Sequence, residues 1–232
     1  METKIYNLII LDESGSMDPT RKETISGCNE IINTVRAAQK KYVGSQQHFL
    51  SIYAFQSGGN PSRYLFENAD PAQVAPITER DYEPCGCTPL YDAIGVTVGR
   101  LAKLVEQTPL SVGAVTIITD GMENSSREYT HSQVAALIDR LKAKGWNFNF
   151  IGANIDVEAV SRSLNIDNAM AFEQSCDGTE AMFQKENSCR GRWFERVSKV
   201  MRNAPSGQPC SEESFNSAMR STSEDYFKDE DK

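Results

Sequence analysis

The sequence predicts an α/β protein: a doubly wound, mostly parallel sheet between two layers of helices, with one short antiparallel edge strand and a C-terminal helical extension. Two observations predict this class. Along the first 173 residues, short apolar runs rich in β-branched residues alternate with longer stretches of helical periodicity. Strands that are joined by helices run parallel and are covered on both faces, which explains why these runs are apolar throughout.

The expected elements follow from composition and from the residues that begin and end them. The run at 4–11 is short, apolar and β-branched, as in a buried strand. Prolines open the helices expected at 19–42 and 89–107, whereas Gly145 ends the helix expected at 132–145. The remaining expected elements are strands at 48–55, 62–66, 113–120, 147–153 and 169–173 and a short helix at 156–164.

The character of the chain changes after residue 173. We expect a domain at 1–173, a helical extension at 174–203 with no further strand to cover, and an acidic, flexible tail at 204–232. Residues 211–232 carry seven acidic and three basic side chains, so this segment supplies half of the net charge of −8. An acidic chain is a poor ligand for nucleic acid or anionic lipid, because phosphate binding relies on clustered Lys and Arg.

The N-terminus and the cysteines indicate a cytoplasmic protein. The apolar stretch near the start is too short for a signal peptide, and no run approaches the roughly 18–20 residues of a membrane helix. The six cysteines form no Cys-x-x-Cys pair, so free thiols are expected. With only His48 and His131 as further ligands, both expected to be structural or surface residues, the sequence offers no zinc site.

Oxygen-bearing side chains follow two of the expected strands. The first strand leads into Asp12, Ser14 and Ser16, and the strand before the third long helix ends in Asp120. In doubly wound order these strands are neighbours where the strand order reverses, which is where ligands bind in open α/β sheets. The loop before the second long helix reaches the same edge and brings Thr88. Taken alone, the Asp-x-Ser-x-Ser run could instead cap the helix that follows it.

Together these side chains supply two carboxylates and three hydroxyls. Hard oxygen ligands without His or Cys suit Mg²⁺, Mn²⁺ or Ca²⁺ better than zinc or copper. The small number of carboxylates favours Mg²⁺, which keeps bound waters and leaves a coordination position open. A carboxylate from another molecule could complete that coordination.

Three motifs resemble the metal-ion-dependent adhesion site (MIDAS) of von Willebrand factor A (VWA) domains, which integrin I domains share. They are Asp-x-Ser-x-Ser after the first strand, the Thr of "TPLYDAI" and the Asp of "ITDG". The resemblance covers about residues 1–173, and "DESGSM", "CTPLYDAIG", "IITDGMENSSREYT" and "FIGANID" are most similar to stand-alone bacterial members. It implies that Ser14, Ser16 and Thr88 contact the metal directly, whereas Asp12 and Asp120 act largely through bound waters and by orienting the hydroxyls. It also implies a protein partner that supplies a Glu or Asp to the metal.

The sequence therefore predicts a metal-dependent protein-binding module and not an enzyme. The alternative is Mg²⁺-dependent phosphoryl transfer at the same edge of the sheet. Phosphatases with an aspartate nucleophile need a second Asp two positions later, where this chain has Ser14. The sequence also contains neither a G-x-x-x-x-G-K-[ST] phosphate-binding run nor a G-x-S-x-G nucleophile elbow.

Other polar residues close to these motifs are expected to support the site. We expect Glu13 and Glu123 to face solvent and to add negative potential at the edge of the sheet. Asp92 is expected to brace the start of its helix, and Asn124 and Ser125 to shape a turn.

Overall fold

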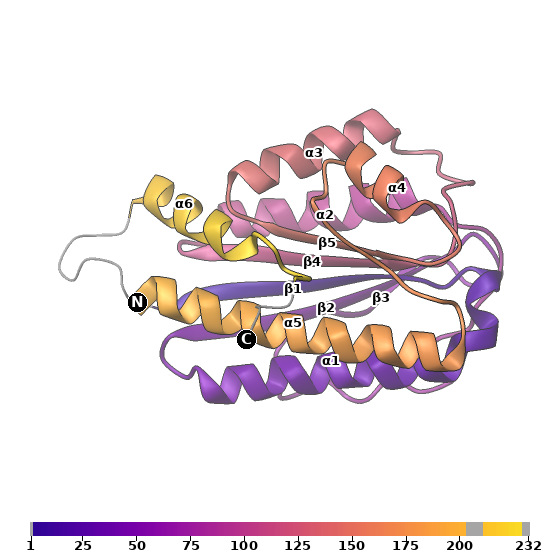
Figure 1. Ribbon diagram of the computed structural model, residues 1–232, viewed down its shortest axis with the longest axis horizontal. Coiled ribbons are helices and arrows are strands. Elements are labelled where there is room, and N and C mark those ends of the chain that lie inside the picture. The colour runs from indigo at the N-terminus through magenta and orange to yellow at the C-terminus, as the bar shows by residue number, and fades with distance from the viewer. Residues whose placement is uncertain (1, 203–210, 229–232) are drawn as a thin grey trace.

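The computed structural model describes residues 2–202 and 211–228, which form a sheet between two layers of helices (Figure 1). The sheet has six strands in the order β3-β2-β1-β4-β5-β6, and only β3 runs antiparallel to its neighbour. The strands are β1 (Thr3–Asp12), β2 (Gln46–Phe55), β3 (Arg63–Ala69), β4 (Ser111–Thr119), β5 (Asn147–Gly152) and β6 (Asn168–Ala171). The helices are the 3₁₀ helix η1 (Gly15–Thr20), α1 (Arg21–Lys41), α2 (Leu90–Glu106), α3 (His131–Ala143), α4 (Val157–Ser163), α5 (Cys176–Arg202) and α6 (Glu212–Ser223).

The strand order confirms the predicted doubly wound topology. β1 lies at the centre, and the chain adds β2 and β3 on one side before it crosses to β4 on the other. β1 and β4 pair in parallel, with Leu11 opposite Ile118, so their carboxyl ends lie next to each other. Almost every residue of both strands is buried, as their mostly apolar composition predicts. None of the described helices is long and apolar enough to cross a membrane.

α1 and α5 cover one face of the sheet, and α2, α3 and α4 cover the other (Figure 1). The expectation that residues 174–203 have no strand to cover is therefore wrong. Arg190 of α5 is buried and donates hydrogen bonds to Asn7 of β1, at 3.0 Å, and to Thr116 of β4, at 2.9 Å. This helix packs on the sheet through polar as well as apolar side chains. Its buried face therefore cannot be recognised in the sequence as an apolar stripe.

The C-terminal segment 211–228 also packs against the rest of the chain. α6 contacts α5, α3 and β5, and Phe215, Met219 and Tyr226 are buried. The hydroxyl of Tyr226 donates to Oε1 of Glu186 in α5 at 3.2 Å. The flexible tail expected from residue 204 is thus wrong for residues 211–228, while residues 203–210 and 229–232 lie outside the described part of the chain.

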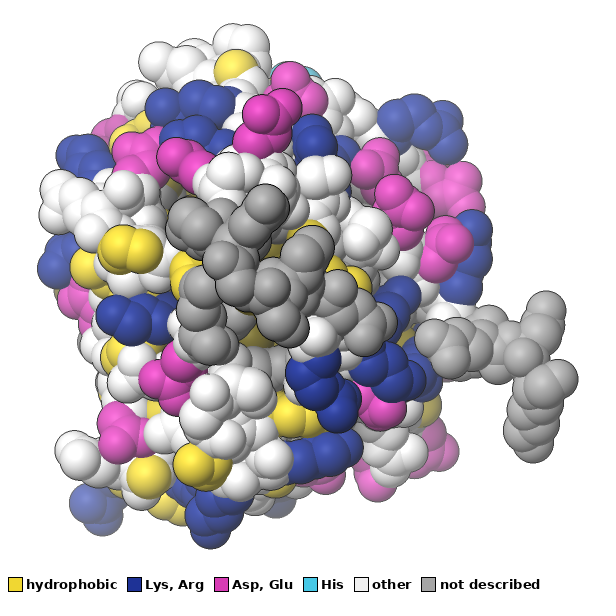
Figure 2. Space-filling model, turned by 90° about the vertical axis from the view of Figure 1, so that its left-hand side faces the viewer, with side chains coloured by type: hydrophobic (Ala, Val, Ile, Leu, Met, Phe, Trp, Pro, Cys, Tyr) yellow, Lys and Arg dark blue, Asp and Glu magenta, His cyan; other side chains and the backbone are white. Residues whose placement is uncertain are grey.

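Charged side chains of both signs are interspersed on the face that lies opposite the carboxyl ends of the parallel strands (Figure 2). Lys and Arg side chains alternate there with Asp and Glu, and small apolar areas separate them.

Candidate metal centre

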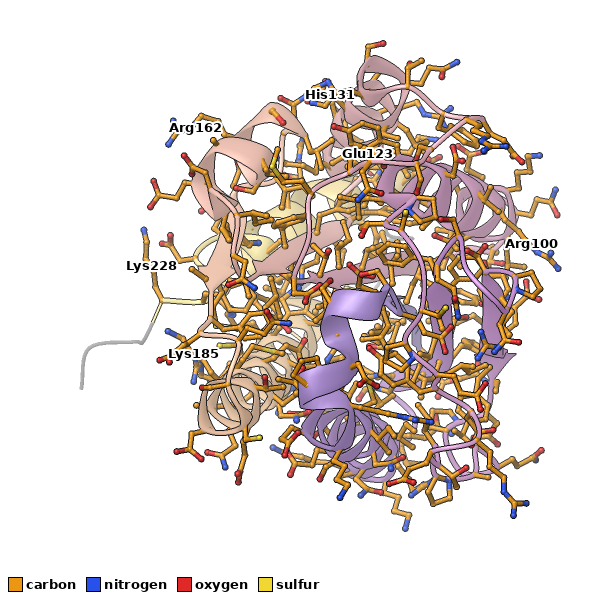
Figure 3. The ribbon with its side chains drawn as sticks, turned by 90° about the vertical axis from the view of Figure 1, so that its right-hand side faces the viewer. Arg100, Glu123, His131, Arg162, Lys185 and Lys228 are labelled. Atoms are coloured by element: carbon orange, nitrogen blue, oxygen red, sulfur yellow. The ribbon has the colours of Figure 1, made fainter. Side chains whose placement is uncertain are left out.

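Three loops meet at the carboxyl edge of the parallel strands, the face shown in Figure 3 with η1 near its centre. The first follows β1 and contains Asp12, Ser14 and Ser16. The second leads into α2 and contains Thr88, and the third follows β4 and contains Asp120. The fold therefore brings to one edge all the side chains that the sequence predicts as metal ligands, although 104 positions separate Ser16 from Asp120.

Asp12 is fully buried, and neutral donors hold both of its carboxylate oxygens. The backbone N–H of Ser14 donates to Oδ1 at 2.7 Å, and the hydroxyl of Thr119 donates to Oδ2 at 2.5 Å. Burial raises the pKa of the Asp12 carboxyl to about 6, although the hydrogen bonds from Thr119 and Ser14 oppose the change. Thr119 at the end of β4 and Ser14 in the loop after β1 thus fix the orientation of the Asp12 carboxylate.

Ser14, Ser16 and Asp120 form a continuous chain of hydrogen bonds. The two serine hydroxyl oxygens lie 3.2 Å apart, and the Ser16 hydroxyl donates to Oδ1 of Asp120 at 2.8 Å. Desolvation raises the pKa of the Asp120 carboxyl, and the hydrogen bond from Ser16 opposes that change. In the described part of the chain, no ion pair includes Asp12 or Asp120. The two acidic side chains therefore meet at the sheet edge without a basic side chain to neutralise them.

Thr88 lies beside Asp120 but is held through its backbone. Its N–H donates to Oδ1 of Asn124 at 2.9 Å, and its carbonyl accepts from the N–H of the same residue at 3.2 Å. A Cβ atom at Gly121 would lie 3.2 Å from the Thr88 hydroxyl oxygen, which places this hydroxyl against the loop after β4. Among the described residues no hydrogen bond joins that hydroxyl to the other four predicted ligands, so its oxygen is not committed to them.

Gly86 allows the loop before Thr88 to reach the site. Its φ angle is +71°, in the left-handed region that favours glycine, and a Cβ atom there would lie 2.4 Å from the backbone nitrogen of Gly58. Its carbonyl accepts the N–H of Gly15 at 3.1 Å, which ties the Thr88 loop directly to the Asp-x-Ser-x-Ser loop.

Solved structures with the same architecture support the predicted resemblance. A von Willebrand factor type A protein from Catenulispora acidiphila is 14% identical, with a TM-score of 0.53 over 82% of this chain and 43% of its own. The pilus adhesin SpaC from Lactobacillus rhamnosus GG is 12% identical, with a TM-score of 0.62 over 84% of this chain and 30% of its own. The chain has the von Willebrand factor A fold.

A third structure with the VWA fold holds a metal. Proximal thread matrix protein 1 from the mussel byssus, solved with a zinc-occupied MIDAS motif, is 12% identical with a TM-score of 0.57 over 81% of this chain and 48% of its own. The chain thus spans less than half the length of each of these three proteins. No protein-family model matches the sequence, and no match was found among curated protein sequences.

Gln174 is a neighbour of the site that the sequence did not indicate. It lies between β6 and α5, and its Nε2 donates to the carbonyl of Ser16 at 2.6 Å and also to Oδ2 of Asp120. Asn154, in the loop after β5, donates in turn to Oε1 of Gln174. Both residues reach the carboxyl edge of the VWA fold because β5 and β6 extend the sheet beside β4. No local sequence pattern predicts their contact with the site.

The two glutamates expected to face solvent do not. Glu13 is fully buried in an ion pair with Arg63 of β3, with Nη1 and Oε2 2.6 Å apart. Glu123 accepts the backbone N–H groups of Tyr91 at 2.9 Å and of Ser126 at 2.7 Å, so it caps the start of α2. Buried or bonded in this way, neither carboxylate joins the predicted ligands, and both instead hold loops of the VWA fold in place.

The remaining polar residues also take structural roles. Asp92 lies in the first turn of α2 and accepts the backbone N–H groups of residues 127–129, each at 2.8 Å, so it ties the start of its own helix to the loop before α3. His48 is buried beside Gln46, and His131 lies against Ser163 and Tyr91, away from the metal ligands predicted here. Among the described residues, no group of three or more His, Cys, Asp or Glu side chains is placed to hold a metal ion, so a cation here depends on the hydroxyls.

Proposed function

We propose that this chain binds a divalent cation at the carboxyl edge of its sheet and uses the cation to bind a protein partner. The observation that supports this most directly is the hydrogen-bonded chain of Ser14, Ser16 and Asp120 beside Asp12, with the Thr88 hydroxyl free of these residues. A cation placed among these oxygens would compensate two carboxylates that no basic side chain in the described part of the chain pairs with.

The donor set fits a hard divalent cation. Ser14, Ser16 and Thr88 would bind it directly, and Asp12 and Asp120 would act through bound waters and by orienting the hydroxyls. Oxygen donors with only two carboxylates favour Mg²⁺, with Mn²⁺ or Ca²⁺ as possible substitutes. The zinc in the MIDAS motif of the mussel protein supports a divalent cation at this place in the fold without selecting Mg²⁺.

The partner would supply an Asp or Glu side chain to the open coordination position. A carboxylate oxygen is a hard ligand that Mg²⁺ accepts readily, and the bond would make partner binding depend on the metal. One structure with this architecture is a pilus adhesin, which is consistent with a role in binding.

We propose binding and not phosphoryl transfer. In the aspartate-nucleophile mechanism, a carboxylate oxygen of the first aspartate must reach the phosphorus. Asp12 is fully buried, and both of its oxygens already accept short hydrogen bonds from Ser14 and Thr119. The position two residues later holds a serine, which cannot serve as the acid and base that this mechanism needs.

A matched pair of variants tests the metal half of this proposal. Asp120→Asn removes one predicted ligand charge, and Asp156→Asn removes a charge from the same edge of the sheet, where Asp156 is exposed and caps α4. We expect wild type and Asp156→Asn to bind Mg²⁺ or Mn²⁺ with similar affinity in calorimetric titrations. Asp120→Asn should bind about 10–100-fold more weakly. No binding by wild type, or equal binding by both variants, would contradict the proposal.

A capture experiment tests the partner half. Wild-type protein would be incubated with lysate of the source cells in Mg²⁺ and in EDTA, with Ser14→Ala as the control. We expect a protein that wild type retains only in Mg²⁺ and that Ser14→Ala does not retain. Equal retention under all three conditions would show that the metal has no role in docking.

A further inference from the structure

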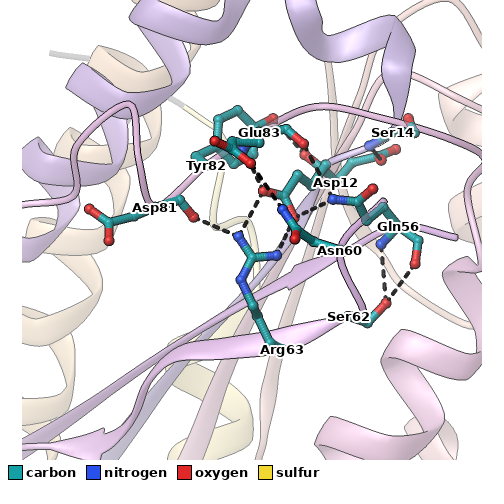
Figure 4. Close-up of polar contacts among 10 residues, drawn as sticks. Asp12, Ser14, Gln56, Asn60, Ser62, Arg63, Asp81, Tyr82 and Glu83 are labelled. Atoms are coloured by element: carbon teal, nitrogen blue, oxygen red, sulfur yellow. Dashed lines mark hydrogen bonds and ion pairs between the residues drawn. The ribbon is translucent and has the colours of Figure 1, made fainter. Parts of the chain in front are cut away.

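Glu13 lies between Asp12 and Ser14 in the sequence, and four hydrogen bonds hold its buried carboxylate. They come from Arg63, Gln56 and Glu83, which are labelled in Figure 4. Oε2 of Glu13 lies 2.6 Å from Nη1 of Arg63, and its Oε1 lies 3.0 Å from Nη2. The side chain of Gln56 donates to Oε2 at 3.0 Å, and the N–H of Glu83 donates to Oε1 at 2.6 Å. Each oxygen thus accepts two hydrogen bonds, which come from the end of β2, the start of β3 and the segment before α2.

The backbone around Glu13 joins the two loops that carry the hydroxyl ligands. Segment 82–86 runs along residues 12–15 and leads directly to Thr88. Three hydrogen bonds connect them: Tyr82 Oη to the Asp12 carbonyl at 2.7 Å, Cys85 N to the Glu13 carbonyl at 2.9 Å and Gly15 N to the Gly86 carbonyl at 3.1 Å. A displacement of Glu13 would therefore move both loops relative to each other.

We propose that Glu13 and Arg63 are positioning residues for the metal site. Their ion pair holds the loop of Ser14 and Ser16 against the loop of Thr88, so that the hydroxyls are in place before a cation arrives. This inference rests on the proposed function, and it names the residues that tune the affinity of that site. The planar guanidinium suits this role because it also donates to the carbonyl of Asp81 at 2.8 Å, so Arg63 joins three segments at once.

The sign of one substitution separates positioning from simple electrostatics. As point charges, Glu13 attracts a cation and Arg63 repels it, so removal of Arg63 would strengthen metal binding. As positioning residues, both support the same loop arrangement, so removal of either would weaken metal binding. A purely structural role would lower the melting temperature and leave metal affinity unchanged.

The test measures the dissociation constant for Mn²⁺ together with the melting temperature in EDTA. The variants are Glu13→Gln and Arg63→Gln, and the matched control is Glu67→Gln on the same strand. Glu67 pairs with Arg100 at 2.7 Å, but these side chains are 30% and 65% exposed. We expect both Glu13→Gln and Arg63→Gln to bind Mn²⁺ at least about 10-fold more weakly. Glu67→Gln should stay within about twofold of wild type.

Arg63→Lys provides a second route if Glu13→Gln does not fold. It keeps the positive charge on a side chain that is only partly buried, but it lacks the two-nitrogen fork with which Arg63 bonds both oxygens of Glu13 and the carbonyl of Asp81. Weaker Mn²⁺ binding by Arg63→Lys at unchanged net charge is expected. Tighter or unchanged binding by Arg63→Gln and Arg63→Lys would overturn the positioning role. Wild-type protein that binds no Mn²⁺ would instead overturn the proposed function and this inference with it.

Discussion

Asp12 and Glu13 are adjacent in the sequence, but the fold gives their carboxylates different surroundings. Glu13 faces the guanidinium of Arg63, whereas the carboxylate of Asp12 accepts hydrogen bonds from neutral donors, among them the backbone N–H of Ser14 and the hydroxyl of Thr119. A buried carboxylate with neutral donors is costly unless a cation compensates it, so the charge of Asp12 remains available for a metal ion. The alternation of side chains after β1 thus separates a carboxylate that is held in an ion pair from one that we propose acts at the metal site.

We expect His48 to make the stability of the protein depend on pH. It lies on β2, packs against Phe194 of α5 and bonds to Gln46, and burial together with nearby Arg190 lowers its pKa from 6.5 to about 3. Below pH 6.5 the imidazole of His48 is protonated in the unfolded chain, whereas in the folded protein it stays neutral down to about pH 3. The free energy of unfolding should therefore decrease as the pH is lowered from 6.5 to about 3, by up to about 1.4 kcal/mol per pH unit.

The measurement is urea unfolding of wild type and His48→Gln between pH 7 and pH 4. We expect wild type to lose stability relative to the variant as the pH falls. Asp12, whose raised pKa acts in the opposite direction, is present in both proteins and cancels in the difference. A difference that stays constant over the whole range would contradict the assigned role of His48.

At the scale of elements, the sequence predicted those strands and helices whose buried faces are apolar. β1 and β4 are mostly apolar runs, and their order placed Asp12 and Asp120 correctly at one edge. The packing of α5 on the sheet was missed because its buried face includes Glu186 and Arg190, which composition assigns to solvent.

The supporting residues of the site were missed for a related reason. Charged residues such as Glu13 are exposed in most proteins, and this one is buried because residues distant in the sequence, Arg63 above all, hold its carboxylate. Gln174 reaches Asp120 across 54 positions of sequence, and no spacing in the chain signals that contact. The sequence motifs therefore predicted which residues are candidate metal ligands. The residues that hold those candidates in place could be identified only from the tertiary structure.

The packing of α1 against α5 gives a prediction at this scale. Gly27 of α1 lies under the ring of Phe183 of α5, and a Cβ atom at this glycine would be 2.0 Å from Cγ of that ring. Gly27→Ala should therefore destabilise the protein by about 1–3 kcal/mol, although alanine is the better helix former. Gly99→Ala in α2, where nothing lies within 4 Å, should stabilise it by about 0.5–1 kcal/mol. Urea unfolding checks both, and equal effects would show that α5 does not pack closely on α1.

At the scale of the whole molecule, the C-terminal segment completes the layer that α5 begins. Tyr226 bonds to Glu186, Glu186 forms an ion pair with Arg190 at 2.6 Å, and Arg190 bonds to the central strands β1 and β4. The indole N–H of Trp193 donates to Thr222 at 3.1 Å. Residues 211–228 therefore hold buried polar groups that would lose their partners in a shorter chain.

Removal of residues 204–232 should consequently destabilise the protein, in contrast to the neutral effect that an acidic, flexible tail would predict. The truncated chain loses the buried side chains of Phe215, Met219 and Tyr226, each worth about 2–5 kcal/mol by comparison with large-to-small substitutions. Their sum is similar to the total stability of a typical domain, so we expect the melting temperature to fall by more than about 10 °C or cooperative unfolding to disappear. An unchanged melting temperature would show that this segment does not dock in solution.

Two neighbouring residues of α6 separate packing from the general effect of a shorter or less charged tail. Met219 is fully buried, whereas the side chain of the next residue, Arg220, is exposed. Met219→Ala should cost about 2–5 kcal/mol because it leaves a cavity between α6 and its neighbours. Arg220→Ala should stay within about 0.5 kcal/mol of wild type. If both variants unfold at the same urea concentration as wild type, α6 contributes nothing to the core, and the loss on truncation would have to come from the residues around Tyr226.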